Sequence, residues 1–343
     1  MNEHRNKNED NRIRTNLLLR SLQAIAGGWI ANRRTEATAG NKDDVIVAAL
    51  YKFVTLKSIQ CQELQQNLKQ FMDLHAMTGN FRVATEGFNG TVAGTRDALD
   101  AFNTKIQRLL DKFGVADKGG DLIYKESRHS QHPFNKAAVK FKKEIVTFGY
   151  VVDPPVERGE YVEPSDWNAA MEKADVVIDV RNDYEVRIGS FRGAVNPKTE
   201  TFPQFAEFVN KKLKPDQTIA MFCTGGIRCE KASAFLKRKG FARVMHLRGG
   251  ILQYFKDIPS ERSEWKGECY LFDRRVSLAH NSLKGSYRQC FGCSAAIGEK
   301  EISSPEYIEG VCCPACFGDK GAEKLAQYRA RHRHMTAGAK DNR

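Results

Sequence analysis

The chain has 343 residues, enough for two or three domains, and its hydrophobic fraction of 41% is sufficient for ordinary cores. It contains no apolar run of about 18 residues, so no membrane-spanning helix is expected. Lys and Arg (54) outnumber Asp and Glu (42), and the net charge of +12 indicates either a polyanionic partner, most often a nucleic acid, or a solvated basic surface.

The distribution of cysteines indicates the cellular compartment of the protein. Five of the nine cysteines lie between Cys290 and Cys316, and the first residues are polar and of mixed charge, unlike a secretory signal peptide. This distribution favours reactive or metal-binding thiols in a reducing compartment over a disulfide scaffold. A cytoplasmic location is therefore predicted.

Residues 1–44 are predicted to be a flexible N-terminal extension with a transient basic helix, and a first folded domain is predicted to begin at Val45. The pair Asn89-Gly90 predicts a tight turn before a strand. Thr95 is predicted to be the N-cap of the helix that follows it. The element order β-α-β-β-α-β predicts a ferredoxin-like (acylphosphatase-like) α+β domain over 45–150. Its strands are predicted at 45–53, 81–84, 91–94, 122–124 and 139–146. Helical spacing of apolar residues predicts a helix at 61–74, and a second helix is predicted at 96–113, after Thr95.

Basic side chains gather near the end of this domain. Lys140 and Lys142 fall on one face of a strand, because side chains alternate with a period of two. Such an edge could bind nucleic-acid phosphates, and a solvated surface explains it equally well. The candidate RNA-binding residues are Arg128, Lys136, Lys140, Lys142 and Lys143.

A second domain follows Asp153-Pro154-Pro155, which is predicted to be a linker. Strands alternate with helices here, which is typical of an open α/β domain whose chemistry lies at the carboxyl ends of the strands. Asp179 and Cys223 both occupy such ends. The predicted strands are 176–178, 218–222 and 244–247, with helices from 165, at 202–213, at 230–239 and from 251.

Cys223 is the candidate nucleophile. It ends an apolar strand and is followed by a glycine pair and a helix start, so that loop N–H groups, the helix N-terminus and Arg228 would all favour the thiolate. The alternative is a buried structural cysteine. The candidate active-site loop is Thr224, Gly225, Gly226, Ile227 and Arg228.

Three further residues are candidates for supporting roles. Asp179 and Arg181 would line the pocket, although Asp179 would equally well brace the loop. Cys229 would be a resolving thiol for an oxidised Cys223 or, as its position at the start of a helix favours, a core residue.

The C-terminal part contains two Cys-x-x-Cys pairs separated by 19 residues. This spacing predicts a tetrahedral structural zinc site, with redox-active or plain reduced cysteines as the alternative. Cys312 is left outside the set. The predicted ligands are Cys290, Cys293, Cys313 and Cys316.

Residues 179–185, 189–194, 223–228 and 248–250 together resemble a rhodanese domain, over about 168–262. The resemblance implies that Cys223 is catalytic. Ser190 departs from the pattern, since many rhodanese domains have His there. The resulting division is an extension (1–44), a ferredoxin-like domain (45–150), a rhodanese domain (168–262), a cysteine-rich segment (263–318) and a basic tail (319–343).

Glu86-Gly87-Phe88-Asn89-Gly90, the stretch 223–233 and the stretch 267–276, in this order and with the later cysteine pairs, are similar to the rhodanese-domain tRNA uridine hydroxylase family. The resemblance implies an enzyme that makes 5-hydroxyuridine at the wobble position 34 of tRNA, with molecular oxygen as co-substrate and an unidentified electron donor. The sequence contains no recognisable flavin, haem or iron motif. Two alternatives remain, a sulfurtransferase acting on thiosulfate or a persulfide, and a non-catalytic RNA-binding protein.

Overall fold

The computed structural model describes residues 45–129, 132–280, 283–318 and 321–337. The predicted extension of residues 1–44 lies outside the described residues. The described part belongs to a unit that begins at Val45 and contains an α+β segment, an α/β segment and a cysteine-rich segment in that order. Among the described helices, none is both long and apolar enough to cross a membrane.

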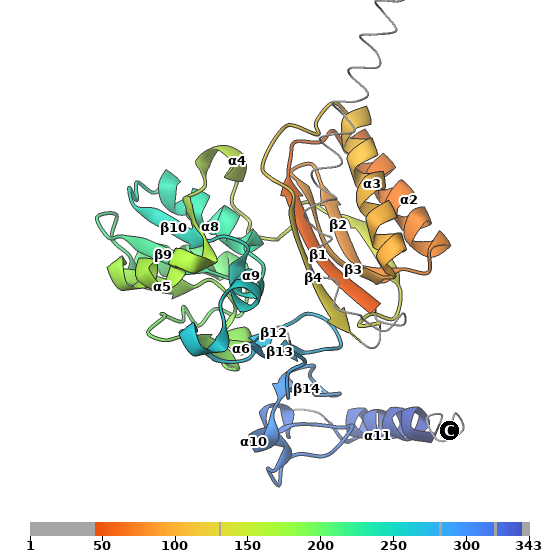
Figure 1. Cartoon of the computed structure of the whole chain (residues 1–343). Helices are drawn as coiled ribbons and strands as arrows, with labels where there is room; N and C mark the ends of the chain where they lie inside the picture. Colours follow the sequence, from red (N-terminus) through yellow and green to blue (C-terminus); the bar gives the residue numbers. More distant parts are fainter. Residues whose placement is uncertain (1–44, 130–131, 281–282, 319–320, 338–343) are drawn as a thin grey trace, which may run out of the picture. The chain divides into compact units, whose positions relative to one another are not determined.

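The first segment is a ferredoxin-like domain made of β1 (Val45–Phe53), α2 (Ser58–Leu74), β2 (Thr78–Ala84), β3 (Gly87–Gly94), α3 (Arg96–Lys112), β4 (Ile123–His129) and β5 (Ala137–Phe141). Its sheet has the order β4-β1-β3-β2-β5, antiparallel except where β5 runs parallel to β2. Figure 1 shows α2 and α3 along one face of this sheet.

The alternation of side chains in β1 determines what each face of the sheet contacts. Ile46, Ala48 and Leu50 are buried in the core that the helices share. Ala49 and Tyr51 lie on the other face, which lines a cavity. As predicted, Thr95 caps α3, and its hydroxyl accepts a hydrogen bond from the N–H of Ala98 (3.2 Å).

The turn predicted at Asn89-Gly90 is wrong. β3 continues through both residues, and the chain reverses at Thr85 and Glu86 instead. Gly90 pairs with Phe81 of β2, and a Cβ atom on Gly90 would lie 2.3 Å from Cδ2 of Phe81. The glycine therefore makes room for an aromatic ring in the sheet.

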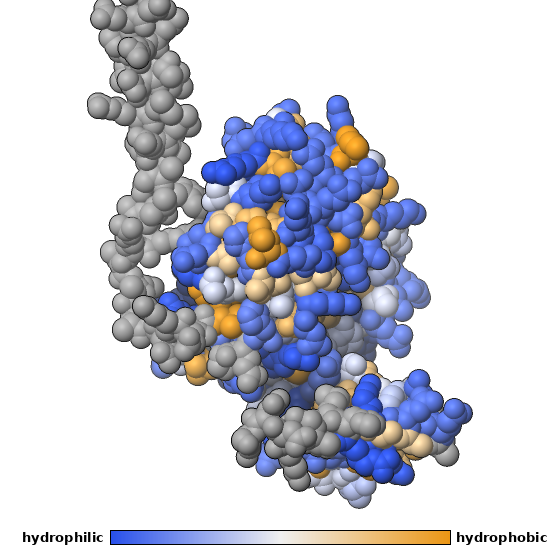
Figure 2. All heavy atoms as spheres, turned by 90° about the vertical axis from the view of Figure 1, so that its right-hand side faces the viewer, coloured by the Kyte–Doolittle hydropathy of each residue, from blue (hydrophilic) through white to orange (hydrophobic). Residues whose placement is uncertain are grey.

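Figure 2 shows the side of the molecule that faces right in Figure 1, where α2 and α3 lie. This surface is largely hydrophilic, with apolar side chains in isolated patches. Ile59 and Leu74 of α2 are among the exposed apolar residues of the protein. Such scattered exposure is ordinary for a protein surface and indicates no docking face here.

The second segment is the α/β domain for which the sequence predicts a rhodanese fold. Its parallel sheet has the order β6-β10-β9-β7, built from β6 (Glu160–Val162), β7 (Val176–Asp179), β9 (Ile219–Phe222) and β10 (Val244–Leu247). The remaining elements are α4 (Pro154–Glu157), α5 (Pro164–Lys173), α6 (Asp183–Val186), β8 (Gly189–Phe191), η1 (Phe202–Gln204), α7 (Phe205–Lys212), α8 (Ile227–Arg238), α9 (Gly250–Asp257) and η2 (Ser260–Arg262).

The junction before this domain differs from the prediction in two places. β5 ends at Phe141, short of the predicted end at residue 146, because Glu144 turns the chain by accepting hydrogen bonds from the N–H groups of Phe148 (3.0 Å) and Gly149 (3.1 Å). The predicted linker at 153–155 instead starts the short helix α4, with Pro154 at its first position, where proline is tolerated.

The third segment consists of short ribbons and helices. β11 pairs with β8 of the rhodanese domain, β12 with β13, and β14 with β15. The predicted tail contains α11, and its last residues (338–343) lie outside the described part. The elements are β11 (Trp265–Gly267), β12 (Cys269–Tyr270), β13 (Ser277–Leu278), β14 (Arg288–Gln289), β15 (Ala296–Ile297), α10 (Glu299–Ile302), η4 (Pro314–Cys316) and α11 (Ala322–Ala337).

Candidate active site

Cys223 lies between the end of β9 and the start of α8, as the sequence predicts. Gly226 has a φ of +96°, a left-handed conformation that glycine adopts without strain, and its N–H donates a hydrogen bond to Sγ of Cys223 (3.2 Å). The predicted loop therefore directs a backbone N–H group at the sulfur.

The Cys223 thiol is favoured in its ionised form. Burial alone would raise its pKa, but a hydrogen bond from the Cys229 thiol, the charge of Arg228 and the backbone N–H groups of both residues outweigh burial. Together they lower the pKa of Cys223 to about 6. Only 1% of the residue is exposed, and it lies at the wall of a cavity.

Cys229 is completely buried and belongs to the hydrophobic core of the rhodanese domain, the arrangement that the sequence favours. Burial raises the pKa of its thiol well above the ordinary value, and the neighbouring Cys223 sulfur raises it further. The Cys229 thiol is therefore protonated and donates to Cys223. Its place beside that sulfur is also compatible with a resolving thiol.

Arg228 has a buried partner that the sequence analysis assigned no role. Its guanidinium donates to both carboxylate oxygens of Glu185, at 2.6 and 2.8 Å, and to the hydroxyl of Thr224 at 3.3 Å. Burial opposes ionisation of Glu185, but the charge of Arg228 prevails and lowers the pKa of Glu185. Glu185 lies in the 179–185 motif. Its position in that motif was the sequence signal that could have identified it as a functional residue.

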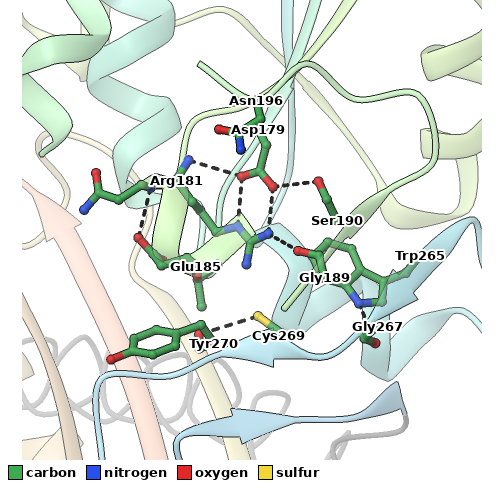
Figure 3. Close-up of polar contacts among 12 residues, drawn as sticks. Asp179, Arg181, Glu185, Gly189, Ser190, Asn196, Trp265, Gly267, Cys269 and Tyr270 are labelled. Carbon is green, nitrogen blue, oxygen red and sulfur yellow. Dashed lines mark hydrogen bonds and ion pairs between the residues drawn. The ribbon is translucent and has the colours of Figure 1, made fainter. Parts of the chain in front are cut away.

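Asp179 and Arg181 form a buried ion pair outside the cavity lining, so the geometry favours the bracing role. Arg181 donates to both carboxylate oxygens of Asp179, at 2.8 and 2.7 Å, and to the carbonyl of Gly189 at 2.6 Å (Figure 3). Ser190 donates to Asp179 at 2.7 Å, and the Arg181 guanidinium lies over the ring of Trp265. The pair thus fixes the chain after β7 against β11.

A cavity of about 730 Å³ opens in front of Cys223. Its walls come from the sheet face opposite α2 and α3, from the loop that follows β9, and from residues 271–278 of the C-terminal segment. Apolar and aromatic residues, including Tyr184 and Phe272, alternate with polar ones such as Asn89 and Arg82. The mixture is typical of a site for a ligand with an aromatic ring and polar substituents.

The predicted basic residues divide between two locations. Lys140 and Lys142 line the cavity, whereas Arg128, Lys136 and Lys143 are exposed outside its lining. Arg82, Lys125 and Arg275 also line it, and the sequence analysis did not single them out. They could not be found from spacing, because the sheet and a distant segment bring them together.

Two of the sequence stretches that carry the family resemblance contact each other, and the third contacts β4 of the first domain. Lys231 of α8 is buried and forms ion pairs with Glu86 (2.8 Å) and Glu144 (2.6 Å) of the first domain. Arg275 of the C-terminal segment donates to the hydroxyl of Ser127 on β4 (2.7 Å). These contacts join the first domain to α8 and to the C-terminal segment around the cavity.

The four predicted zinc ligands form one cluster, with their sulfur atoms all within 4.8 Å of one another. The Sγ–Sγ distances are 3.9 Å for Cys290–Cys316, 3.7 Å for Cys293–Cys313 and 4.0 Å for Cys313–Cys316. A tetrahedron with Zn–S bonds of about 2.3 Å has edges of about 3.8 Å. The cluster can therefore bind a metal ion such as zinc, while Cys312 donates to the carbonyl of Glu306 instead.

Two family models match the chain. The UPF0176 acylphosphatase-like domain matches residues 45–145, and the rhodanese-like domain matches residues 163–257. The chain thus joins a UPF0176 domain to a rhodanese-like domain. This combination is consistent with the UPF0176 family.

Solved structures of rhodanese-like proteins are among those similar to parts of this chain. A rhodanese-related protein from Thermoplasma volcanium is 26% identical, with 29% of this chain and 95% of that chain covered and a TM-score of 0.24. The rhodanese-like domain of an Anabaena sp. protein is 19% identical (31% and 78% covered, TM-score 0.26). A rhodanese-like domain protein from Staphylococcus aureus is 18% identical (28% and 90% covered, TM-score 0.24).

Proposed function

We propose that this protein is a cytoplasmic tRNA-modifying enzyme that hydroxylates carbon 5 of the wobble uridine, position 34, with Cys223 as the reactive residue. The observation that carries the proposal is that Cys223, whose thiol has a lowered pKa, lines a cavity of about 730 Å³ with both aromatic and polar walls. Thiosulfate has only five heavy atoms and needs far less space, whereas a nucleotide suits a cavity of this class.

The cavity face of the first domain supports an RNA substrate. Lys140, Arg82, Asn89 and Tyr51 form one row across β5, β2, β3 and β1, because each is the register partner of the next. Strands lie about 4.8 Å apart, so the row spans about 14 Å. Its cationic end would bind backbone phosphates, and its Tyr51 end lies beside the Cys223 loop, where the base would enter.

The proposed reaction begins with addition of the Cys223 thiolate to carbon 6 of uracil. The addition makes carbon 5 electron-rich, so that carbon 5 forms a bond to an oxygen atom supplied by molecular oxygen. Loss of the proton on carbon 5 and departure of the thiolate restore the ring double bond. One oxygen atom ends in 5-hydroxyuridine and the other in water, with two electrons from an unidentified donor and two protons.

A sulfurtransferase acting on thiosulfate or a persulfide is the second candidate. The Gly226 N–H directed at Cys223 Sγ would equally stabilise a cysteine persulfide. This alternative leaves the sheet row and the cysteine cluster without a role. A non-catalytic RNA-binding protein is disfavoured by the lowered pKa of Cys223.

Nucleoside analysis of bulk tRNA tests the proposal. Cells that carry Cys223→Ala as the only copy are expected to lack 5-hydroxyuridine and its derivatives, whereas Cys312→Ser is a control outside both the cavity and the sulfur cluster. Purified protein should then modify unmodified tRNA in the presence of oxygen and a reductant. Unchanged nucleosides in the Cys223→Ala cells, together with lost thiosulfate activity, would establish the sulfurtransferase instead.

A further inference from the structure

Lys125 of β4 contacts the active-site loop from another domain. Its ammonium donates a hydrogen bond to the carbonyl oxygen of Gly225 at 2.8 Å, across 100 residues of sequence. Lys125 also lines the cavity that Cys223 lines. Its side chain packs closely against the turn before α9, since a Cβ atom on Gly249 would lie 3.0 Å from Cε of Lys125.

The peptide group between Gly225 and Gly226 links this lysine to the sulfur. Its C=O accepts from Lys125 (2.8 Å), and its N–H donates to Sγ of Cys223 (3.2 Å). A cation on the carbonyl polarises the peptide and strengthens the hydrogen bond made by its N–H, as in other hydrogen-bond chains. The same contact fixes the direction in which that N–H points.

We propose that Lys125 is a positioning residue for Cys223, by which the ferredoxin-like domain activates the thiol of the rhodanese-like domain. The ammonium holds and polarises the Gly225–Gly226 peptide and adds a positive charge beside the thiolate. The inference rests on Cys223 as the reactive thiol of the proposed function, and it does not depend on which substrate is used.

The surrounding charges agree with this role. Glu230 of α8 accepts hydrogen bonds from the hydroxyls of Tyr51 (3.0 Å) and Tyr161 (2.6 Å), and burial raises its pKa. Burial lowers the pKa of Lys125 to about 8, although the charges of Cys223 and Glu230 favour its ammonium form. Electrostatic attraction is mutual, so the ammonium also favours the Cys223 thiolate.

Every titratable group that faces the sulfur must be considered in a test. Arg228 and Cys229 approach it from α8 and lower its pKa, while Lys125 and Tyr51 come from the sheet. Glu230 disfavours ionisation of Cys223, because the negative charges of the carboxylate and the thiolate repel each other. Among these groups Lys125 is the one that combines a positive charge with a contact to the loop backbone.

The test measures the alkylation rate of Cys223 by iodoacetamide as a function of pH, in the full-length chain, by mass spectrometry of the peptide that contains it. Lys125→Met is expected to raise the pH of half-maximal alkylation by about one unit, because a nearby cation and a polarised hydrogen bond are lost. Lys125→Arg should retain most of the wild-type profile. Lys118→Met removes an exposed lysine outside the cavity lining. It serves as the control, because it loses the same single positive charge as Lys125→Met.

Lys125→Gln keeps the inference testable if the methionine variant does not fold, because it retains a hydrogen-bond donor without the charge. An intermediate upward shift in this variant supports the proposal. A Lys125→Met or Lys125→Gln protein that folds and has the wild-type profile overturns it. The assay contains no tRNA, so its result is independent of whether Cys223→Ala changes tRNA nucleosides.

Discussion

Arg228 binds Glu185 through two hydrogen bonds, with Nη1–Oε2 and Nη2–Oε1 distances of 2.6 and 2.8 Å, and both side chains are buried. The cation beside the Cys223 thiolate is therefore held in place before any substrate binds. Because Glu185 balances much of this charge, the backbone N–H groups and the Cys229 thiol become important for stabilising the thiolate.

Replacement of Glu185 by Gln is expected to destabilise the protein by about 3 kcal/mol, because it leaves the guanidinium buried without its counter-charge. Urea denaturation measures the free energy of unfolding. Glu207→Gln removes the acid of an exposed helical ion pair with Lys211 and should have no measurable effect. Equal stabilities for the two variants would contradict the importance of the buried pair.

The reactivity of Cys223 should rise with pH and reach half its maximum near pH 6. Thiolate is the nucleophile, so below this pH the rate falls about tenfold for each unit as the sulfur becomes protonated. Stopped alkylation reactions between pH 4 and pH 9 provide the measurement. A half-maximum near the ordinary cysteine value would show that burial prevails over the surrounding donors.

Cys229→Ala is expected to shift that profile to higher pH, because it removes the thiol that donates to Cys223. Cys229→Ser keeps a donor and should stay close to the wild type. If Cys229 acts instead as a resolving thiol, both variants would accumulate oxidised Cys223 after peroxide treatment, which mass spectrometry detects. The pH profile and the oxidation assay thus separate the two roles.

The sequence predicts the order of elements and the loop around Cys223 because these depend on local patterns. A nearly continuous apolar run identifies β1, and the strand–glycine–helix succession identifies the Cys223 loop. The turn at Asn89-Gly90 was misassigned because a glycine that accommodates Phe81 has the same local pattern as a hairpin turn.

Lys125 and Glu230 could not be predicted in the same way. Their roles arise from contacts between domains, and nothing near either residue in the sequence distinguishes it from an ordinary surface lysine or helix glutamate. Lys231 is similar, since a charged helix residue is normally solvated, whereas here two carboxylates make its burial tolerable. Tertiary contacts of this kind leave no periodic pattern.

The cysteine cluster should contain about one zinc ion per chain, measured by elemental analysis of protein purified without added metal. Cys290→Ser and Cys313→Ser are expected to lose the ion, whereas Cys312→Ser should retain it. Removal of zinc with a strong chelator should accelerate hydrogen exchange in residues 290–316, since the local core consists largely of the cysteines themselves. Unaltered exchange after complete removal would contradict a structural metal.

The row of cations on the cavity face should contribute to tRNA binding through phosphate contacts. Arg82→Gln and Lys140→Gln are each expected to weaken binding and to reduce the slope of log affinity against log salt by about 0.7, the value for one phosphate on a single strand. Filter binding of tRNA at several salt concentrations measures both quantities, and Lys118→Gln is the control for loss of one charge. Because Arg82 and Lys140 are direct register partners and can share one phosphate, the double variant should reduce the slope by at least the larger single effect and at most the sum of the two. A slope that stays at the wild-type value in the double variant would place the RNA on another face of the protein.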